Sequence, residues 1–68
     1  MAIKINISRM LGERKMNMRE LSDKTGIRPS TISALYYEET KRIEIEQINA
    51  LCKALDCGVG DIFEYVED

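Results

Sequence analysis

The side chains of this chain that could carry chemistry fall into three groups: two thiols, one run of hydroxyls, and the charged residues. The thiols are Cys52 and Cys57, and the 68 residues include no histidine. A serine or cysteine nucleophile would therefore lack an imidazole base, and a zinc site would lack its usual four ligands. Both cysteines fit reduced, mostly buried thiols. We expect no enzyme, no metal site, no cofactor and no small-molecule ligand.

The hydroxyl run lies in GIRPSTIS, residues 26–33, which joins two expected helices. Gly26 is suited to ending the first helix, because glycine accepts the left-handed conformation. Pro29 is suited to starting the second, because its missing N–H costs nothing at the first helical position. Two helices joined by so short a turn cross steeply, which is the helix-turn-helix geometry. The second helix then presents an exposed N-terminal end that fits the major groove of DNA.

The charged residues are unevenly distributed along the chain, although the net charge is only −2. Residues 1–42 carry nine Lys or Arg against five Asp or Glu, a local charge of +4. Residues 43–68 carry one Lys against seven acids, a local charge of −6. Only the first part could therefore face a phosphate backbone.

Four further helices must position the one that begins at Pro29, which we expect to span residues 29–37. Asn6 is placed as the N-cap of a helix over about residues 7–15. In NMRE, Asn17 and the acid three residues later resemble a capping box for a helix that ends near Thr25. Ile27 and Ile32 are spaced as a hydrophobic staple at the start of the 29–37 helix.

A fourth, amphipathic helix and a final turn follow a polar loop. The apolar face of the fourth helix comprises Ile45, Ile48, Leu51, Cys52 and Leu55. Gly58 ends it and precedes a last turn that contains Val59, Ile62 and Phe63.

The two ends of the chain have the pattern of β-strands. In residues 1–7 apolar side chains alternate with others, so Met1, Ile3, Ile5 and Ile7 would share one half-buried face. One strand needs a partner, and residues 62–66 could pair with it in this chain or in a second copy. The expected fold class is all-α: a five-helix domain that contains a helix-turn-helix, with short β-strands at its N- and C-termini as an open possibility.

Residues 19–42, RELSDKTGIRPSTISALYYEETKR, resemble the helix-turn-helix of the Cro and phage-repressor (Xre-like) transcriptional regulators. Helix order and spacing stay similar from about residue 7 to residue 64, and the subgroup is the small stand-alone repressors. The matching positions are Leu21, Ser22, Gly26, Ile27, Ile32 and Leu35, followed by the segment ALDCGVGDIFE. The resemblance implies one helix-turn-helix DNA-binding domain over residues 1–68, with its motif at about residues 18–37.

The resemblance also implies which residues meet DNA. Base-contacting candidates are Arg28, Ser30, Thr31, Ser33 and Ala34. Phosphate-contacting candidates are Asn17, Arg19, Lys24, Tyr37, Lys41 and Arg42. Serine and threonine hydroxyls can bond either base edge, and an arginine can bind guanine through two hydrogen bonds. Phosphate contacts position a protein without specifying sequence.

The expected function is a sequence-specific DNA-binding regulator, a repressor, whose partner is double-stranded DNA. One short helix contacts few base pairs, so we expect a homodimer that spans two half-sites. Its expected surface is the N-terminal strand with residues 59–66; if the terminal strands pair within one chain, another surface dimerises. The alternative is a protein-interaction module, such as an antitoxin or anti-repressor with the same shape. No signal peptide or membrane span is evident, so we expect a cytoplasmic protein.

Overall fold

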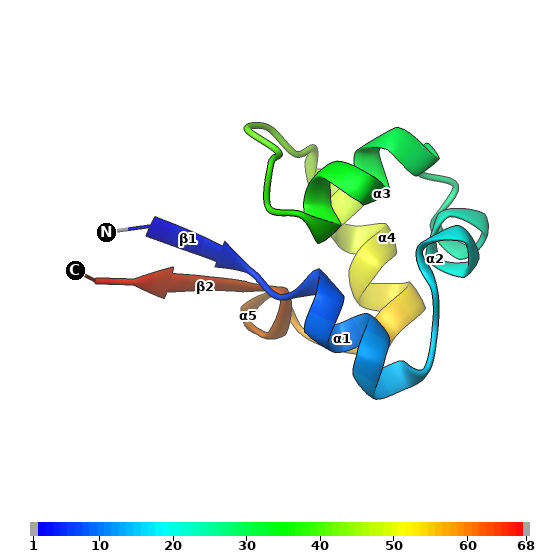
Figure 1. Cartoon of the computed structure of the whole chain (residues 1–68), viewed down its shortest axis with the longest axis horizontal. Coiled ribbons are helices and arrows are strands. Elements are labelled where there is room, and N and C mark those ends of the chain that lie inside the picture. The colour runs from blue at the N-terminus through cyan, green and yellow to red at the C-terminus, as the bar shows by residue number, and fades with distance from the viewer. Residues whose placement is uncertain (1, 68) are drawn as a thin grey trace.

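The computed structural model describes residues 2–67 as five helices and a two-stranded antiparallel sheet. In chain order the elements are β1 (Ala2–Ile5), α1 (Ile7–Arg14), α2 (Met18–Thr25), α3 (Pro29–Tyr36), α4 (Ile45–Leu55), α5 (Val59–Ile62) and β2 (Phe63–Val66). The helices form one body, and the paired strands project from it as a ribbon (Figure 1). This arrangement confirms the expected fold class.

Every helix contributes to the core of the helical body. The side chains with no exposed surface are Ile7, Leu21, Ile32, Leu35, Leu51, Leu55 and Ile62. Burial of each such side chain is worth about 1.5–3 kcal/mol relative to an exposed one. Because α3 contributes both Ile32 and Leu35, its inner side is fixed to the core and its outer side is left accessible.

The two asparagines expected as N-caps behave differently. Asn17 caps α2 through a reciprocal pair of bonds: its Oδ1 accepts from the Glu20 N–H at 2.8 Å, and Glu20 Oε1 accepts from the Asn17 N–H at 3.2 Å. Asn6 occupies the N-cap position of α1 as predicted, but its side chain makes no cap bond to that helix. Asn6 directly follows β1, and its amide donates instead to Glu64 Oε1 at 3.5 Å.

The turn between α2 and α3 has the conformation that the sequence indicated. Gly26 has a φ of 76°, in the left-handed region, and its N–H donates to the carbonyl oxygen of Ser22 at 2.9 Å. The Ser22 hydroxyl then donates to the carbonyl oxygen of Ile27 at 2.5 Å. Ile27 and Ile32 are both buried, as a staple requires. The helix that begins at Pro29 ends at Tyr36, one residue earlier than expected.

The strands pair within this chain, in the register Ala2 with Val66 through Ile5 with Phe63. The expected half-buried face was wrong for most of β1, since Ile3 is 60% exposed and only Ile5 is buried. The reason is that the ribbon extends beyond the helices (Figure 1), so only its inner end reaches the core. Met1, expected at the start of this strand, lies outside the described residues.

Two predictions about the second half of the chain were wrong in detail. Ile45 is 79% exposed because it is the first residue of α4, beyond the edge of the core. α4 ends at Leu55 with Asp56 in the left-handed region, so Gly58 does not end it and instead precedes α5. Val59 and Ile62 lie in the expected last turn, which is α5, and Cys52 and Cys57 are free, partly buried thiols. None of the helices between residues 2 and 67 has the length and apolar character needed to cross a membrane.

Candidate nucleic-acid interface

The expected base-contacting residues occupy the accessible side of α3 and the residue before it. Arg28 and Ser30 are exposed, whereas Thr31, Ser33 and Ala34 are half-buried. The outer side of the helix therefore combines one long cation with short polar or apolar side chains. Such a surface can approach a base edge closely, with Arg28 as its longest hydrogen-bonding group.

Local sequence fixes the position of Arg28. It has an extended backbone, with φ −57° and ψ 144°, which is the conformation favoured for a residue before proline. Its carbonyl oxygen accepts from the N–H groups of Thr31 and Ile32, at 3.0 and 3.1 Å, and so begins α3. Among residues 2–67 the Arg28 guanidinium has no hydrogen-bond or ion-pair partner, which leaves its donors available to an outside acceptor.

A groove of about 1150 Å³ lies beside the start of α3. It brings together Arg28 and Thr31 with Lys41 and Arg42, which belong to the segment between α3 and α4. The Thr40 hydroxyl donates to the carbonyl oxygen of Arg42 at 2.8 Å and holds that segment in shape. The structure thus places two expected base-contacting residues and two expected phosphate-contacting residues around one hollow.

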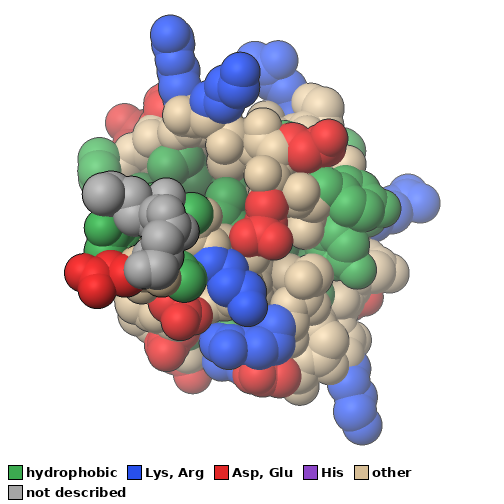
Figure 2. All heavy atoms as spheres, turned by 60° about the vertical axis from the view of Figure 1, so that its left-hand side comes forward, with side chains coloured by type: hydrophobic (Ala, Val, Ile, Leu, Met, Phe, Trp, Pro, Cys, Tyr) green, Lys and Arg blue, Asp and Glu red, His purple; other side chains and the backbone are tan. Residues whose placement is uncertain are grey.

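The charges of the molecule are less separated in space than in sequence. In Figure 2, Lys and Arg side chains project from the top of the molecule, at the level of α3 and residues 37–44 in Figure 1. Other Lys and Arg side chains lie lower on this face, among acidic ones. The basic end is not purely basic, because Glu44 and Glu46 also line the groove. These carboxylates set a limit on how deeply a phosphate can enter it.

The other expected phosphate-contacting residues lie outside this groove. Asn17 and Arg19 are exposed at the N-terminal end of α2. Lys24 lines a smaller hollow with Asn49 and Lys53. Tyr37 is 59% exposed and packs edge-on against the Tyr36 ring, with the ring centroids 5.0 Å apart. The structure therefore does not gather all the candidates into one site.

Sequence reasoning missed several groove residues, among them Thr40 and Gln47. Gln47 Oε1 accepts from the Glu44 N–H at 3.1 Å and fixes the first turn of α4. The sequence did contain a signal for Gln47, because a glutamine three residues after a possible N-cap is half of a capping box. Since Glu44 and Gln47 line the groove, the N-terminal end of α4 borders it, and this end carries a partial positive charge.

The two cysteines lie away from this groove, at the end of α4. Burial raises the pKa of the Cys57 thiol, and the neighbouring Cys52 and Asp61 raise it further. A raised pKa keeps the thiol protonated near neutral pH, so Cys57 is a poor nucleophile. Within residues 2–67 no three His, Cys, Asp or Glu side chains are placed to hold a metal ion.

Comparison with known proteins agrees with this geometry. The family model described as the Cro/C1-type HTH DNA-binding domain matches residues 6–68. The chain is 47% identical over its full length to the uncharacterized HTH-type transcriptional regulator YozG of Bacillus subtilis (strain 168), and it covers 81% of that protein. The crystal structure of SinR, the master regulator for biofilm formation, in complex with DNA has a similar fold. Its TM-score is 0.73 and its identity 22%, over 79% of this chain and 86% of SinR.

At 22% identity the match to SinR shows a similar fold only, whereas the family model and the similarity to YozG show the family. The family consists of DNA-binding regulators and is not a family of enzymes. The tight turn between α2 and α3, the accessible outer side of α3 and the family model over residues 6–68 agree, and this chain belongs to the Cro/C1-type helix-turn-helix DNA-binding family.

Proposed function

We propose that the chain is a sequence-specific transcriptional repressor that inserts α3 into the major groove of double-stranded DNA as a homodimer. The observation that carries this proposal is the groove at the start of α3, where Arg28 meets Lys41 and Arg42. An arginine at the exposed start of a helix can enter a groove of DNA while neighbouring cations hold the phosphates beside it.

The residues divide into two roles under this proposal. Arg28 binds a guanine edge, and the short side chains of Ser30, Thr31, Ser33 and Ala34 let α3 approach the bases. Lys41 and Arg42 hold the phosphate backbone next to the groove. The N-terminal end of α2, with Asn17 and Arg19, supplies a second phosphate contact, and Lys24 and Tyr37 supply weaker ones. Repression is the simplest outcome, because a protein that occupies a promoter blocks access without needing an activating surface.

The dimer is supported by the ribbon, which keeps an open apolar face although its strands pair within one chain. Ile3 and Tyr65 are cross-strand partners on this face, and they are 60% and 55% exposed. Two copies joined through these faces would cover the apolar side chains and present two α3 helices to half-sites about 34–36 Å apart.

Selection of bound duplexes from a random library, followed by titration at several salt concentrations, tests the proposal. We expect enrichment of an inverted repeat and an affinity that falls steeply with salt as counterions are released. If no duplex is bound at low salt, including DNA upstream of its own gene, the repressor proposal is lost. The alternative function, a protein-interaction module of antitoxin or anti-repressor type, would then account for Glu44 and Glu46 in the groove.

Sedimentation over a concentration series tests the dimer separately. A species twice the chain mass of 7.8 kDa is expected to accumulate as concentration rises. A monomer at every concentration, both free and on a two-half-site duplex, would contradict the dimer without contradicting DNA binding.

A further inference from the structure

Glu38 has a backbone conformation that its side chain disfavours. Its φ is 57°, in the left-handed region, and it lies two residues beyond the end of α3. The Glu38 N–H donates to the carbonyl oxygen of Leu35 at 3.2 Å, and the Glu39 N–H donates to that of Ala34 at 2.8 Å. These two bonds form a Schellman motif, in which the left-handed position is normally glycine. A glutamate here is strained, and a strained residue invites a functional explanation.

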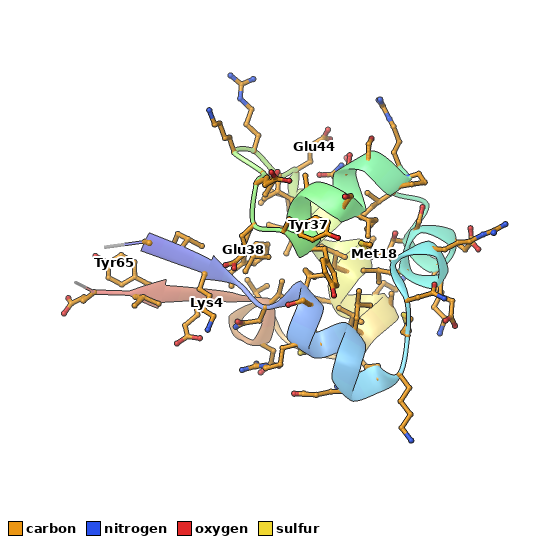
Figure 3. The ribbon with its side chains drawn as sticks, in the orientation of Figure 1. Lys4, Met18, Tyr37, Glu38, Glu44 and Tyr65 are labelled. Atoms are coloured by element: carbon orange, nitrogen blue, oxygen red, sulfur yellow. The ribbon has the colours of Figure 1, made fainter. Side chains whose placement is uncertain are left out.

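The side chain of Glu38 supplies that explanation. Its Oε1 accepts a hydrogen bond from the N–H of Ile5, at 2.9 Å, across 33 positions of sequence. Figure 3 shows Glu38 between the end of α3 and β1. The backbone of Glu38 is thus bonded to α3 while its carboxylate is bonded to the ribbon.

The bond fills a position on the outer edge of β1 that β2 cannot reach. The Asn6 N–H donates to the carbonyl oxygen of Ile62 at 2.7 Å, so Asn6 faces β2. Because successive strand residues point their amides in opposite directions, the Ile5 N–H points away from β2. Ile5 is buried, and a buried N–H without an acceptor is costly. Glu38 satisfies this donor and also denies it to any strand that might add to that edge.

We propose that Glu38 is a positioning residue that fixes the orientation of α3 relative to the ribbon. This inference rests on the proposed function, in which the ribbon joins two copies and α3 meets DNA. The separation and rotation between the two α3 helices then depend on how rigidly each ribbon is tied to its own α3. A one-base-pair change between half-sites shifts one of them by about 3.4 Å and turns it by about 35°. A rigid anchor therefore makes the dimer selective for one half-site spacing.

The test compares three substitutions of Glu38 with a neighbouring control. Glu38→Gln keeps an oxygen acceptor, Glu38→Ala removes the acceptor, and Glu38→Gly removes it while relieving the left-handed strain. Glu38→Gly therefore guards against a variant that simply fails to fold. Glu39→Ala is the matched control, because it removes an adjacent exposed carboxylate that makes no side-chain bond to the ribbon.

Each variant is measured on the duplex selected with the unmutated chain, on versions with one base pair added or removed between half-sites, and on an isolated half-site. We expect Glu38→Ala and Glu38→Gly to lower the preference for the native spacing at least about fivefold, with half-site affinity within about twofold of the unmutated chain. Glu38→Gln and Glu39→Ala should keep the preference. Exchange of the Ile5 amide should accelerate at least about tenfold in the Ala and Gly variants only.

The outcomes separate the inference from the function on which it rests. If the unmutated chain binds its duplex and the Ala and Gly variants keep the spacing preference, or keep the Ile5 amide protected, the positioning role is overturned while DNA binding stands. If the unmutated chain binds no duplex, the proposed function fails and the spacing role fails with it. In that case the exchange rate of the Ile5 amide in the Glu38 variants still shows whether the Glu38 carboxylate ties the ribbon to α3.

Discussion

The helix-turn-helix segment (residues 17–37) and the ribbon (β1 with β2) are built by different means. In the segment, each change of direction is set by residues within a few positions: the Asn17–Glu20 box, Gly26, and Pro29. In the ribbon, the paired residues come from opposite ends of the chain, and Ile3 and Tyr65 stay exposed. The comparison indicates that the helix-turn-helix is complete within one copy, whereas the ribbon still exposes apolar side chains.

The largest expected difference between the two regions is in stability. Leu35→Ala removes a fully buried side chain of α3 and should lower the free energy of unfolding by about 2–5 kcal/mol. Ile3→Ala, in the exposed part of the ribbon, should lower it by less than about 1 kcal/mol in a dilute sample. Urea denaturation of both variants measures the contrast. Equal losses would mean that the ribbon is part of the core, against the comparison drawn above.

The next effect concerns the proposed DNA-contacting residues of the segment and of the loop that follows it. Arg28→Ala should cost about 1–3 kcal/mol of discrimination between the selected duplex and one altered at a single guanine. Lys41→Ala should weaken binding to both duplexes equally and reduce the salt slope by about 1. Titrations at several salt concentrations measure both quantities. If Arg28→Ala weakens binding to both duplexes equally, Arg28 contacts phosphate rather than a base.

The two asparagines give a smaller contrast between the regions. Asn17→Ala removes the cap of α2 and should cost about 1 kcal/mol of stability, measured without DNA. Asn6→Ala removes only the long bond to Glu64 and leaves both backbone bonds of Asn6 in place, so its cost should be smaller. Thermal unfolding of the two variants compares them. A larger loss for Asn6→Ala would show that the junction with the ribbon is more tightly held than α2.

The smallest expected effect distinguishes the two faces of the ribbon. Val66 shares one face with Ala2 and Lys4, whereas Ile3 and Tyr65 share the other. Val66→Thr should change the free energy of unfolding by less than about 0.5 kcal/mol and leave the monomer–dimer equilibrium unchanged. Ile3→Thr should weaken the dimer. Sedimentation of both variants measures the monomer–dimer equilibrium. Weaker association from Val66→Thr alone would place the junction on the opposite face.

Much of the fold followed from local pattern, and the errors have a common cause. The stripe positions Ile32, Leu35, Leu51 and Leu55 were predicted as core and are buried. Ile3 and Ile45 had the right residue type and period but lie beyond the edge of the helical body. Periodicity predicts which face of a helix or strand is apolar. It does not predict how far the neighbouring elements extend along that face and cover it.

The residues of the candidate site stay predictions, and what the structure adds is their grouping. Gly26 and Pro29 located the start of α3, the family resemblance implied its base-contacting residues, and charge singled out the Lys41–Arg42 pair. Their assembly with Thr31 around one groove depends on the path of residues 37–44, for which the sequence has no regular pattern. The separation of Lys24 from that groove likewise depends on the crossing of α2 and α4.

The amino-acid sequence by itself determined the helix boundaries near the turn, the cap of α2, the left-handed glycine and the division of charge. These features depend on residues a few positions apart and need no contact with distant segments. Only the tertiary structure decided that the terminal strands pair with each other, that Arg28 lines the same groove as Arg42, and that Glu38 binds the amide of Ile5. Those contacts join distant segments, and their geometry is set by how the helices pack together.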